Sequence, residues 1–182
     1  MMIGIRRRVT RFGGMLGVAI LSLTSLTSCT PDQDLTFYSN KVYHTSMSSF
    51  TTWWKNDHAA VLGVSVAQIN TWWDLGIGLL DQPLAKDAYW DMSTDFCSNS
   101  PDTGAYFNFK APCVRHDFSW RNLKKMDRRH KVSYFNTKAQ RVGANQQFET
   151  DMKSHCATRS AIYKTMCNAT AKAYYEAVMA AA

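Results

Sequence analysis

Apolar residues recur at intervals of three and four along five stretches of the chain, the spacing that places them on one face of an α-helix. These stretches cover residues 42–58, 64–80, 112–128, 144–156 and 160–180. No stretch of comparable length alternates apolar and polar residues with the period of two that is typical of a half-buried strand. The pattern therefore predicts a mainly α fold.

Glycine and proline mark the breaks between these predicted helices. Gly63 separates the first two helices, and Pro112 suits the first turn of the third, because proline lacks the N–H group that has no helical partner there. Residues 89–97 are expected to form a short extended segment or a loop. Residues 98–112 contain further breakers, so we expect a loop that leads into the third helix.

The first residues have the composition of an export signal. Four arginines precede an apolar run over residues 15–26, which is too short to span a bilayer comfortably. The Leu-Thr-Ser before Cys29 fits the pattern of bacterial lipoproteins, so we expect Cys29 to become the acylated first residue and to anchor the exported protein to the cell envelope. Cleavage nearby by an ordinary signal peptidase, with Cys29 left free in a secreted protein, stays open. We divide the chain into a lipoprotein-type signal peptide (1–28), a polar tether without apolar periodicity (29–41) and a helical domain (42–182).

Cysteine content and charge narrow the class of protein. Setting Cys29 aside leaves four cysteines, an even number that favours two disulfides in an exported protein and permits three pairings. The formal charge of +7 includes the four arginines of the leader, and its removal leaves 17 basic and 14 acidic residues. So small an excess does not indicate the dense basic face of a nucleic-acid-binding protein.

A histidine and an aspartate stand side by side in the third predicted helix. Asp117 lies one turn after Cys113, and a second carboxylate, Asp95, stands two residues before Cys97. Residues i and i+4 share a helix face and residues i and i+2 share one side of a strand, so a disulfide between these cysteines would let both carboxylates share a metal. The plainer alternative is that His116 packs within the helix and Asp117 pairs with the arginine four residues later.

An ordered series of residues surrounds this pair. Its members are Asp95, Phe96, Cys97, Ser100, Pro101, Asp102, Cys113, Arg115, His116, Asp117, Phe118, Arg121, Asn122, Phe148, Asp151, Met152, Lys153, Cys156, Cys167, Asn168, Thr170, Tyr174, Tyr175, Ala177 and Val178. The series, spread over residues 90–178, resembles the secreted phospholipase A2 family of bacteria and fungi. The resemblance implies the disulfides Cys97–Cys113 and Cys156–Cys167, and a small disulfide-stapled helical domain in which two antiparallel core helices carry the site.

The same resemblance implies a calcium-dependent hydrolase that cleaves the sn-2 acyl ester of glycerophospholipids. Asp95 and Asp117 would bind Ca²⁺ through their side chains and Phe96 through its main-chain carbonyl, with water or substrate completing a shell of oxygen ligands. His116 would act as the general base that takes a proton from the attacking water, so no protein nucleophile is needed. The partner would be a phospholipid membrane or micelle, and we expect a monomer that binds no nucleic acid.

One departure from the family pattern concerns the histidine. In the family an aspartate on the neighbouring helix orients this side chain, and the matching position here is Asn145, or Gly143 in a shifted alignment. Asparagine accepts a hydrogen bond from imidazole, but it does not stabilise an imidazolium as a carboxylate does. We therefore expect reduced activity or, as the alternative function, a non-catalytic lipid-binding or surface-interaction lipoprotein on the same scaffold. An envelope structural protein without a ligand is the second rival.

A second departure is the basic segment over residues 123–143, which is longer than its counterpart in the family. We expect it to form a cationic loop beside the cleft. Such a loop would either hold the protein on an anionic membrane surface or remain solvated without a partner.

Overall fold

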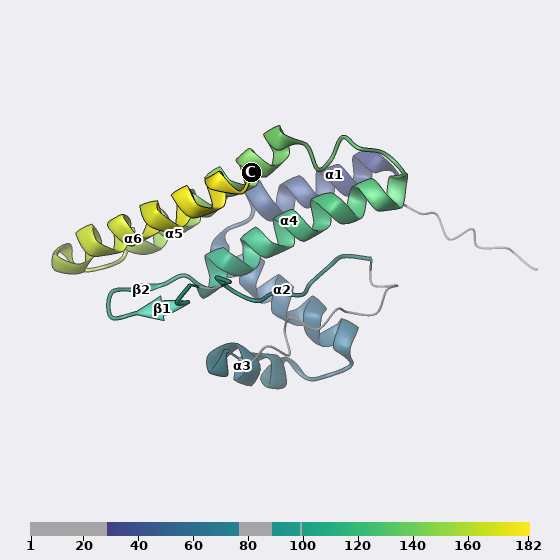
Figure 1. The fold of residues 1–182 in the computed structure, drawn as a ribbon. Coiled ribbons are helices and arrows are strands. Elements are labelled where there is room, and N and C mark those ends of the chain that lie inside the picture. Colours follow the sequence, from purple (N-terminus) through teal and green to yellow (C-terminus); the bar gives the residue numbers. More distant parts are fainter. Residues whose placement is uncertain (1–28, 77–88, 99) are drawn as a thin grey trace, which may run out of the picture.

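The computed structural model describes residues 29–76, 89–98 and 100–182, and within these residues the fold is mainly α, as predicted (Figure 1). The elements are the helices α1 (Pro31–Ser39), α2 (Met47–Leu62), α3 (Val66–Leu75), α4 (Lys110–His130), α5 (Lys138–Ala157) and α6 (Ala161–Ala180), a π-helical turn η1 (Asn40–His44), and the short strands β1 (Thr103–Gly104) and β2 (Phe107–Asn108). The two strands pair antiparallel inside the segment that was expected to be a loop. The expected signal peptide, residues 1–28, lies outside the described residues.

Capping side chains set the ends of the first helices. The predicted helix over 42–58 starts later, at Met47, because the Ser46 hydroxyl accepts a hydrogen bond from the Ser49 backbone N–H at 3.2 Å. The predicted helix over 64–80 is α3, which ends at Gly76 in a left-handed conformation with φ of 64°. The part of that prediction beyond residue 76 lies outside the described residues.

The expected polar tether is instead an ordered helix along most of its length. Thr30 caps α1 through the backbone N–H of Gln33, and Tyr38 is fully buried. The buried positions also include Asp34, which accepts hydrogen bonds from Tyr89, Arg129 and His130. Because one of its inward-facing residues is a carboxylate, this helix shows no apolar period in the sequence.

The basic segment over residues 123–143 is mostly helical, so the expected cationic loop is wrong. Helix α4 continues to His130 and α5 already begins at Lys138. Arg129 and His130 at the end of α4 both bind Asp34 of α1, so two of the basic residues hold the fold together. A buried carboxylate needs such partners, because an unpaired charge in the interior is costly.

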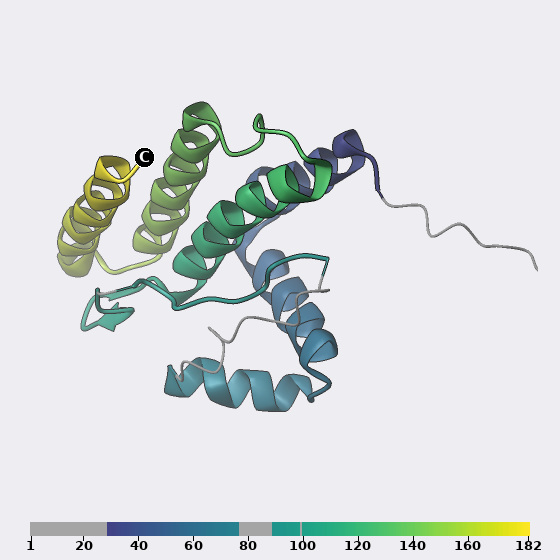
Figure 2. The same cartoon turned by 45° about the vertical axis from the view of Figure 1, so that its right-hand side comes forward.

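Helices α4 and α5 are antiparallel neighbours, and α6 packs on the outer side of α5 (Figure 2). Arg115 of α4 joins this pair to the N-terminal part, since its guanidinium donates to Asp151 of α5 at 3.2 Å and to the Thr45 carbonyl at 2.7 Å. One core cluster, rich in aromatic residues, lies between α1, α2 and α4, and a second lies where β2 and α4 meet α5 and α6. Both predicted disulfides, Cys97–Cys113 and Cys156–Cys167, are formed.

Helix α6 exposes a row of apolar residues. Ile162 and Met166 are 75% and 49% exposed, and Ala169, Ala173 and Ala177 continue the row toward the end of the helix. The opposite side of α6, with Cys167 and Ala171, is buried against α5. In the described part of the chain, every helix falls short of the length and apolar content needed to cross a membrane.

Candidate active site

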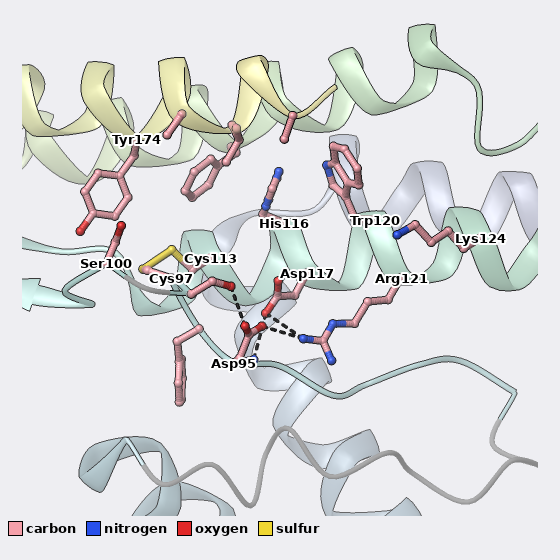
Figure 3. Close-up of a pocket in the computed structure, with 16 residues that line it drawn as sticks. Asp95, Cys97, Ser100, Cys113, His116, Asp117, Trp120, Arg121, Lys124 and Tyr174 are labelled. Atoms are coloured by element: carbon pink, nitrogen blue, oxygen red, sulfur yellow. Dashed lines mark hydrogen bonds and ion pairs between the residues drawn. A yellow bond between two sulfur atoms is a disulfide. The ribbon is translucent and has the colours of Figure 1, made fainter.

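A cleft of about 600 Å³ runs along α4 between α6 and the segment that carries Asp95 (Figure 3). The four residues singled out from the sequence, Asp95, Phe96, His116 and Asp117, all line it. The Cys97–Cys113 disulfide joins the segment to the first turn of α4, so that the carboxylate two residues before Cys97 faces the one on the helix. The remaining lining residues are Cys97, Ser98, Ser100, Cys113, Trp120, Arg121, Lys124, Phe148, Tyr174, Ala177, Val178 and Ala181.

The orientation of His116 is fixed by Asn145 of α5. The Nε2 atom of His116 lies 2.7 Å from Asn145 Oδ1, and the indole N–H of Trp120 donates to the same oxygen at 3.0 Å. An indole nitrogen can only donate, so this Asn145 atom is an acceptor and His116 Nε2 must carry the proton that it receives. The Nδ1 atom of His116 therefore keeps its lone pair and is the basic nitrogen.

The surroundings keep His116 neutral. Burial lowers the pKa of His116 below its ordinary value, and the hydrogen bond to Asn145 opposes this shift only in part. The imidazole also stacks on the Phe148 ring, with a centroid distance of 4.7 Å. A neutral imidazole with a free Nδ1 is the form that a general base requires at neutral pH.

Asn145 also contacts the C-terminal turn of α6. Its side-chain Nδ2 donates to the Val178 carbonyl at 3.0 Å and lies 3.6 Å from Met179 Sδ. The carbonyls at a helix C-terminus carry partial negative charge, so they favour an N–H donor over a carboxylate at this position. The local structure therefore accommodates asparagine specifically, since an aspartate would lose this hydrogen bond.

Two carboxylates lie beside the histidine. Asp117 Oδ2 accepts hydrogen bonds from the Thr94 hydroxyl at 2.6 Å and from the Asp95 backbone N–H at 3.2 Å. Arg121 approaches both carboxylates from one side, with its Nη2 atom 2.6 Å from Asp95 Oδ1 and 3.9 Å from Asp117 Oδ2 (Figure 3). The expected alternative pairing of Asp117 with Arg121 is thus present, but at the longer of the two distances.

The two carboxyl groups differ in acidity. Burial raises the pKa of Asp117 to about 8, against the opposing effects of the Thr94 hydroxyl and the Arg121 charge. Burial acts in the same direction on Asp95, but the Ser98 hydroxyl, which donates at 2.6 Å, and the Arg121 charge bring the pKa of Asp95 below its usual value. A buried carboxylate with a raised pKa binds a cation with release of its proton.

The donor chemistry of this corner fits a hard cation. Asp95 and Asp117 supply carboxylate oxygens, which Ca²⁺ and Mg²⁺ prefer. The backbone between them turns sharply, because Phe96 adopts a left-handed conformation with φ of 57° that is uncommon for a residue other than glycine. Within the described ranges no three His, Cys, Asp or Glu side chains converge on one point. Any cation here would therefore depend on main-chain or solvent oxygens for its remaining ligands.

Several residues in or behind the cleft were not recognised from the sequence. Ser98 in the lining and the buried Thr94 behind it hold the two carboxylates, but isolated hydroxyl residues in a loop give no signal of such a role. Trp120 and Lys124 follow His116 at steps of four residues, so their position on the same face of α4 could have been inferred from helical spacing.

The fold and the cleft together define a disulfide-linked, helical scaffold in which a buried histidine lies in a cleft with two carboxylates. A sequence model of the prokaryotic phospholipase A2 family matches residues 80–182, more than half of the chain. The chain therefore belongs to the prokaryotic phospholipase A2 family. It is also similar to a protein named secretory phospholipase A2 from Arthroderma benhamiae, with 31% identity over 88 residues. The match covers 47% of this chain and 55% of that protein, so the chain spans about half the length of this curated relative.

Proposed function

We propose that the protein is a calcium-dependent phospholipase A2 that hydrolyses the sn-2 acyl ester of glycerophospholipids. The observation that carries this proposal is the geometry of His116 in a cleft lined by two carboxylates. Its Nε2 is held by Asn145, while its Nδ1 has no hydrogen-bond partner among the residues that the structure describes. Membership of the prokaryotic phospholipase A2 family supports the class of reaction. Beyond this class, the proposal specifies calcium as the metal, His116 as the base and the sn-2 ester as the bond that is cleaved.

In the proposed reaction, His116 Nδ1 takes a proton from a water molecule as the water oxygen bonds to the ester carbonyl carbon. The bond between that carbon and the glycerol oxygen then breaks, and His116 returns the proton to the departing oxygen. The products are a fatty acid and a lysophospholipid. Asn145 and Trp120 maintain the required tautomer throughout, because the Asn145 oxygen accepts hydrogen bonds from both rings.

The side chains of Asp95 and Asp117, together with the main-chain carbonyl of Phe96, would hold the calcium ion. When bound, the ion would polarise the ester carbonyl and stabilise the negative charge that develops on its oxygen. Asp117 must lose its proton to bind a cation. Asp95 must bind the cation while it also pairs with Arg121. Both requirements point to weak binding of the ion, consistent with a site that has only two carboxylates.

A phospholipid surface is the proposed partner. The exposed apolar row of α6, from Ile162 to Ala177, leads to the cleft, because Ala177 also lines it. An apolar helix face beside a cleft suits shallow insertion into the surface of a micelle or bilayer. The two disulfides and the name of the secretory relative fit an exported protein. Anchoring through Cys29, which is exposed, and a monomeric state remain part of the proposal.

The test uses a phospholipid that carries different acyl chains at its two ester positions, presented in mixed micelles. Mass spectrometry of the products identifies the fatty acid released, with calcium and with a chelator. The proposal expects release of the sn-2 chain alone and only in calcium. Release of the sn-1 chain, or equal release in chelator, would contradict it.

A second candidate, a lipid-binding protein without catalysis, is favoured by one observation. The residue that contacts His116 Nε2 is an amide, so a protonated His116 has no carboxylate to stabilise it on that side. Calcium-dependent binding to vesicles without fatty-acid release would establish this candidate.

A further inference from the structure

Lys124 occupies the end of the cleft beyond the histidine. His116, Trp120 and Lys124 follow one another at steps of four residues on one face of α4, and all three line the cleft. The ring centroids of His116 and Trp120 lie 5.9 Å apart, and Lys124 Nζ lies 5.8 Å from the Trp120 ring (Figure 3). The Trp120 ring thus lies between the Lys124 charge and the His116 imidazole along this face of α4.

This charge differs from that of the neighbouring arginine. Arg121 reaches both Asp95 and Asp117, so its charge is balanced by carboxylates. Among the residues that the structure describes, Lys124 forms no ion pair with an acidic side chain. Arg141 also lies near Trp120, at 5.8 Å from its ring, but its guanidinium donates to the Asn136 carbonyl and to a main-chain oxygen of Ala182, the last residue of the sequence. An excess of positive charge against an aromatic wall attracts an anion.

The opposite end of the cleft is uncharged. It is formed by the Cys97–Cys113 disulfide, Ala177 and Tyr174, whose hydroxyl donates to the Pro101 carbonyl. Figure 3 shows Tyr174 and Lys124 at opposite ends, with His116 between them. The cleft therefore has a cationic end, a central base and an uncharged, largely apolar end.

We propose that Lys124, seated beside Trp120, is the subsite for the phosphate of the lipid headgroup. This inference rests on the proposed function and extends it to the orientation of the substrate. The phosphate of a glycerophospholipid is attached to the glycerol carbon next to the one that carries the sn-2 ester. Phosphate at Lys124 would thus bring that ester toward His116, with the acyl chain directed toward Tyr174. Lysine binds phosphate as a point charge, so the subsite sets orientation without requiring one headgroup.

The kinetic test compares a short-chain phosphatidylcholine below its micelle concentration with a diacylglycerol that has the same acyl chains. We expect Lys124→Gln to lower kcat/KM for the phospholipid about tenfold more than for the diacylglycerol, the effect of one charge-assisted hydrogen bond. Lys124→Arg should retain most of the preference. Lys164→Gln removes the same charge from an exposed position on α6 outside the cleft and is the matched control. An equal loss for both substrates, or the same change with the control, would overturn the proposal.

A binding test does not depend on hydrolysis. The indole N–H resonance of Trp120, assigned by its disappearance in Trp120→Phe, is followed as dodecylphosphocholine is added below its micelle concentration. We expect a shift that is absent with an uncharged dodecyl glycoside and lost in Lys124→Gln. Inorganic phosphate in a parallel titration separates a free anion from a lipid phosphate, and a shift with inorganic phosphate alone would overturn the lipid assignment.

The two tests separate this proposal from the proposed function. If the wild-type protein releases no fatty acid but dodecylphosphocholine still shifts Trp120 through Lys124, the subsite stands and catalysis fails. If hydrolysis occurs but Trp120 does not respond, the subsite is wrong and the catalytic proposal stands.

Discussion

Replacing Asn145 with aspartate tests whether the residue at position 145 controls the stability of protonated His116. The new carboxylate would lie 2.7 Å from Nε2, where the amide oxygen now is. A hydrogen bond to a charged group contributes about 1.5–3 kcal/mol, compared with about 1 kcal/mol for a neutral one. The gain for the protonated histidine in the transition state is therefore about 0.5–2 kcal/mol, so we expect hydrolysis to accelerate about 2- to 30-fold.

The same substitution should lower stability. Aspartate cannot donate to the Val178 carbonyl, and its charge would be buried beside the C-terminal carbonyls of α6. Loss of this hydrogen bond costs about 1–3 kcal/mol, which denaturant unfolding would measure. We therefore expect Asn145 to stabilise α6 while limiting the rate of the proposed hydrolysis.

The pH profile gives a further signature. Burial lowers the pKa of His116, so the acid limb of kcat/KM for the wild-type protein should lie below the ordinary histidine value. A carboxylate favours the protonated ring and raises this pKa, so Asn145→Asp should move the acid limb to higher pH. Gln146→Glu adds a carboxylate at the adjacent, exposed position of α5 and should change neither rate nor profile. An Asn145→Asp variant with an unchanged rate and acid limb would refute the proposed role of Asn145 beside the catalytic base.

Three further predictions concern the supports of the site. Asp34→Ala should lower the free energy of unfolding by about 3 kcal/mol in denaturant titration, because it leaves Arg129 and His130 without their buried partner; a loss below 1 kcal/mol would contradict this. Replacing both Cys97 and Cys113 with serine should cost about 3 kcal/mol of stability, because their disulfide links residues 16 apart in the sequence. It should also raise the calcium concentration needed for half-maximal activity, because the disulfide holds the segment that carries Asp95. An unchanged calcium requirement would argue against Asp95 as a ligand. Ile162→Glu combined with Met166→Glu should reduce hydrolysis of vesicles about tenfold or more and leave hydrolysis of a monomeric substrate unchanged, because charged side chains do not insert into the lipid surface as Ile162 and Met166 would. An equal loss on both substrates would count against the role of the α6 face.

The sequence predicted the centre of the site better than its surroundings. The His–Asp pair and the cysteines stand at spacings that helix geometry makes readable, and both disulfides formed as the family resemblance implied. The resemblance left Asn145 and Gly143 as alternatives beside His116, and the structure places Asn145 there. The left-handed conformation of Phe96 was not, because it depends on how Thr94 and Ser98 fold around the two carboxylates.

Other features were missed because apolar periodicity detects only some helix faces. Helix α1 buries Asp34 alongside Tyr38, so its inward face does not appear apolar. The end of α4 buries few apolar groups, and its arginine and histidine contact that same carboxylate. In α6 the apolar row from Ile162 was readable, but periodicity does not tell whether protein covers such a row, and here it is exposed. Export and acylation of Cys29 stay predictions.

The central claim is that His116 is the base of a calcium-dependent phospholipid hydrolysis, and fatty-acid release by His116→Gln tests it most directly. Glutamine keeps a polar side chain of similar length but cannot accept the proton. With the melting temperature unchanged and calcium present, the account predicts wild-type release and a loss of about 100-fold or more in the variant. Comparable release by both proteins, or none by the wild-type protein while it binds calcium and lipid, would contradict the account.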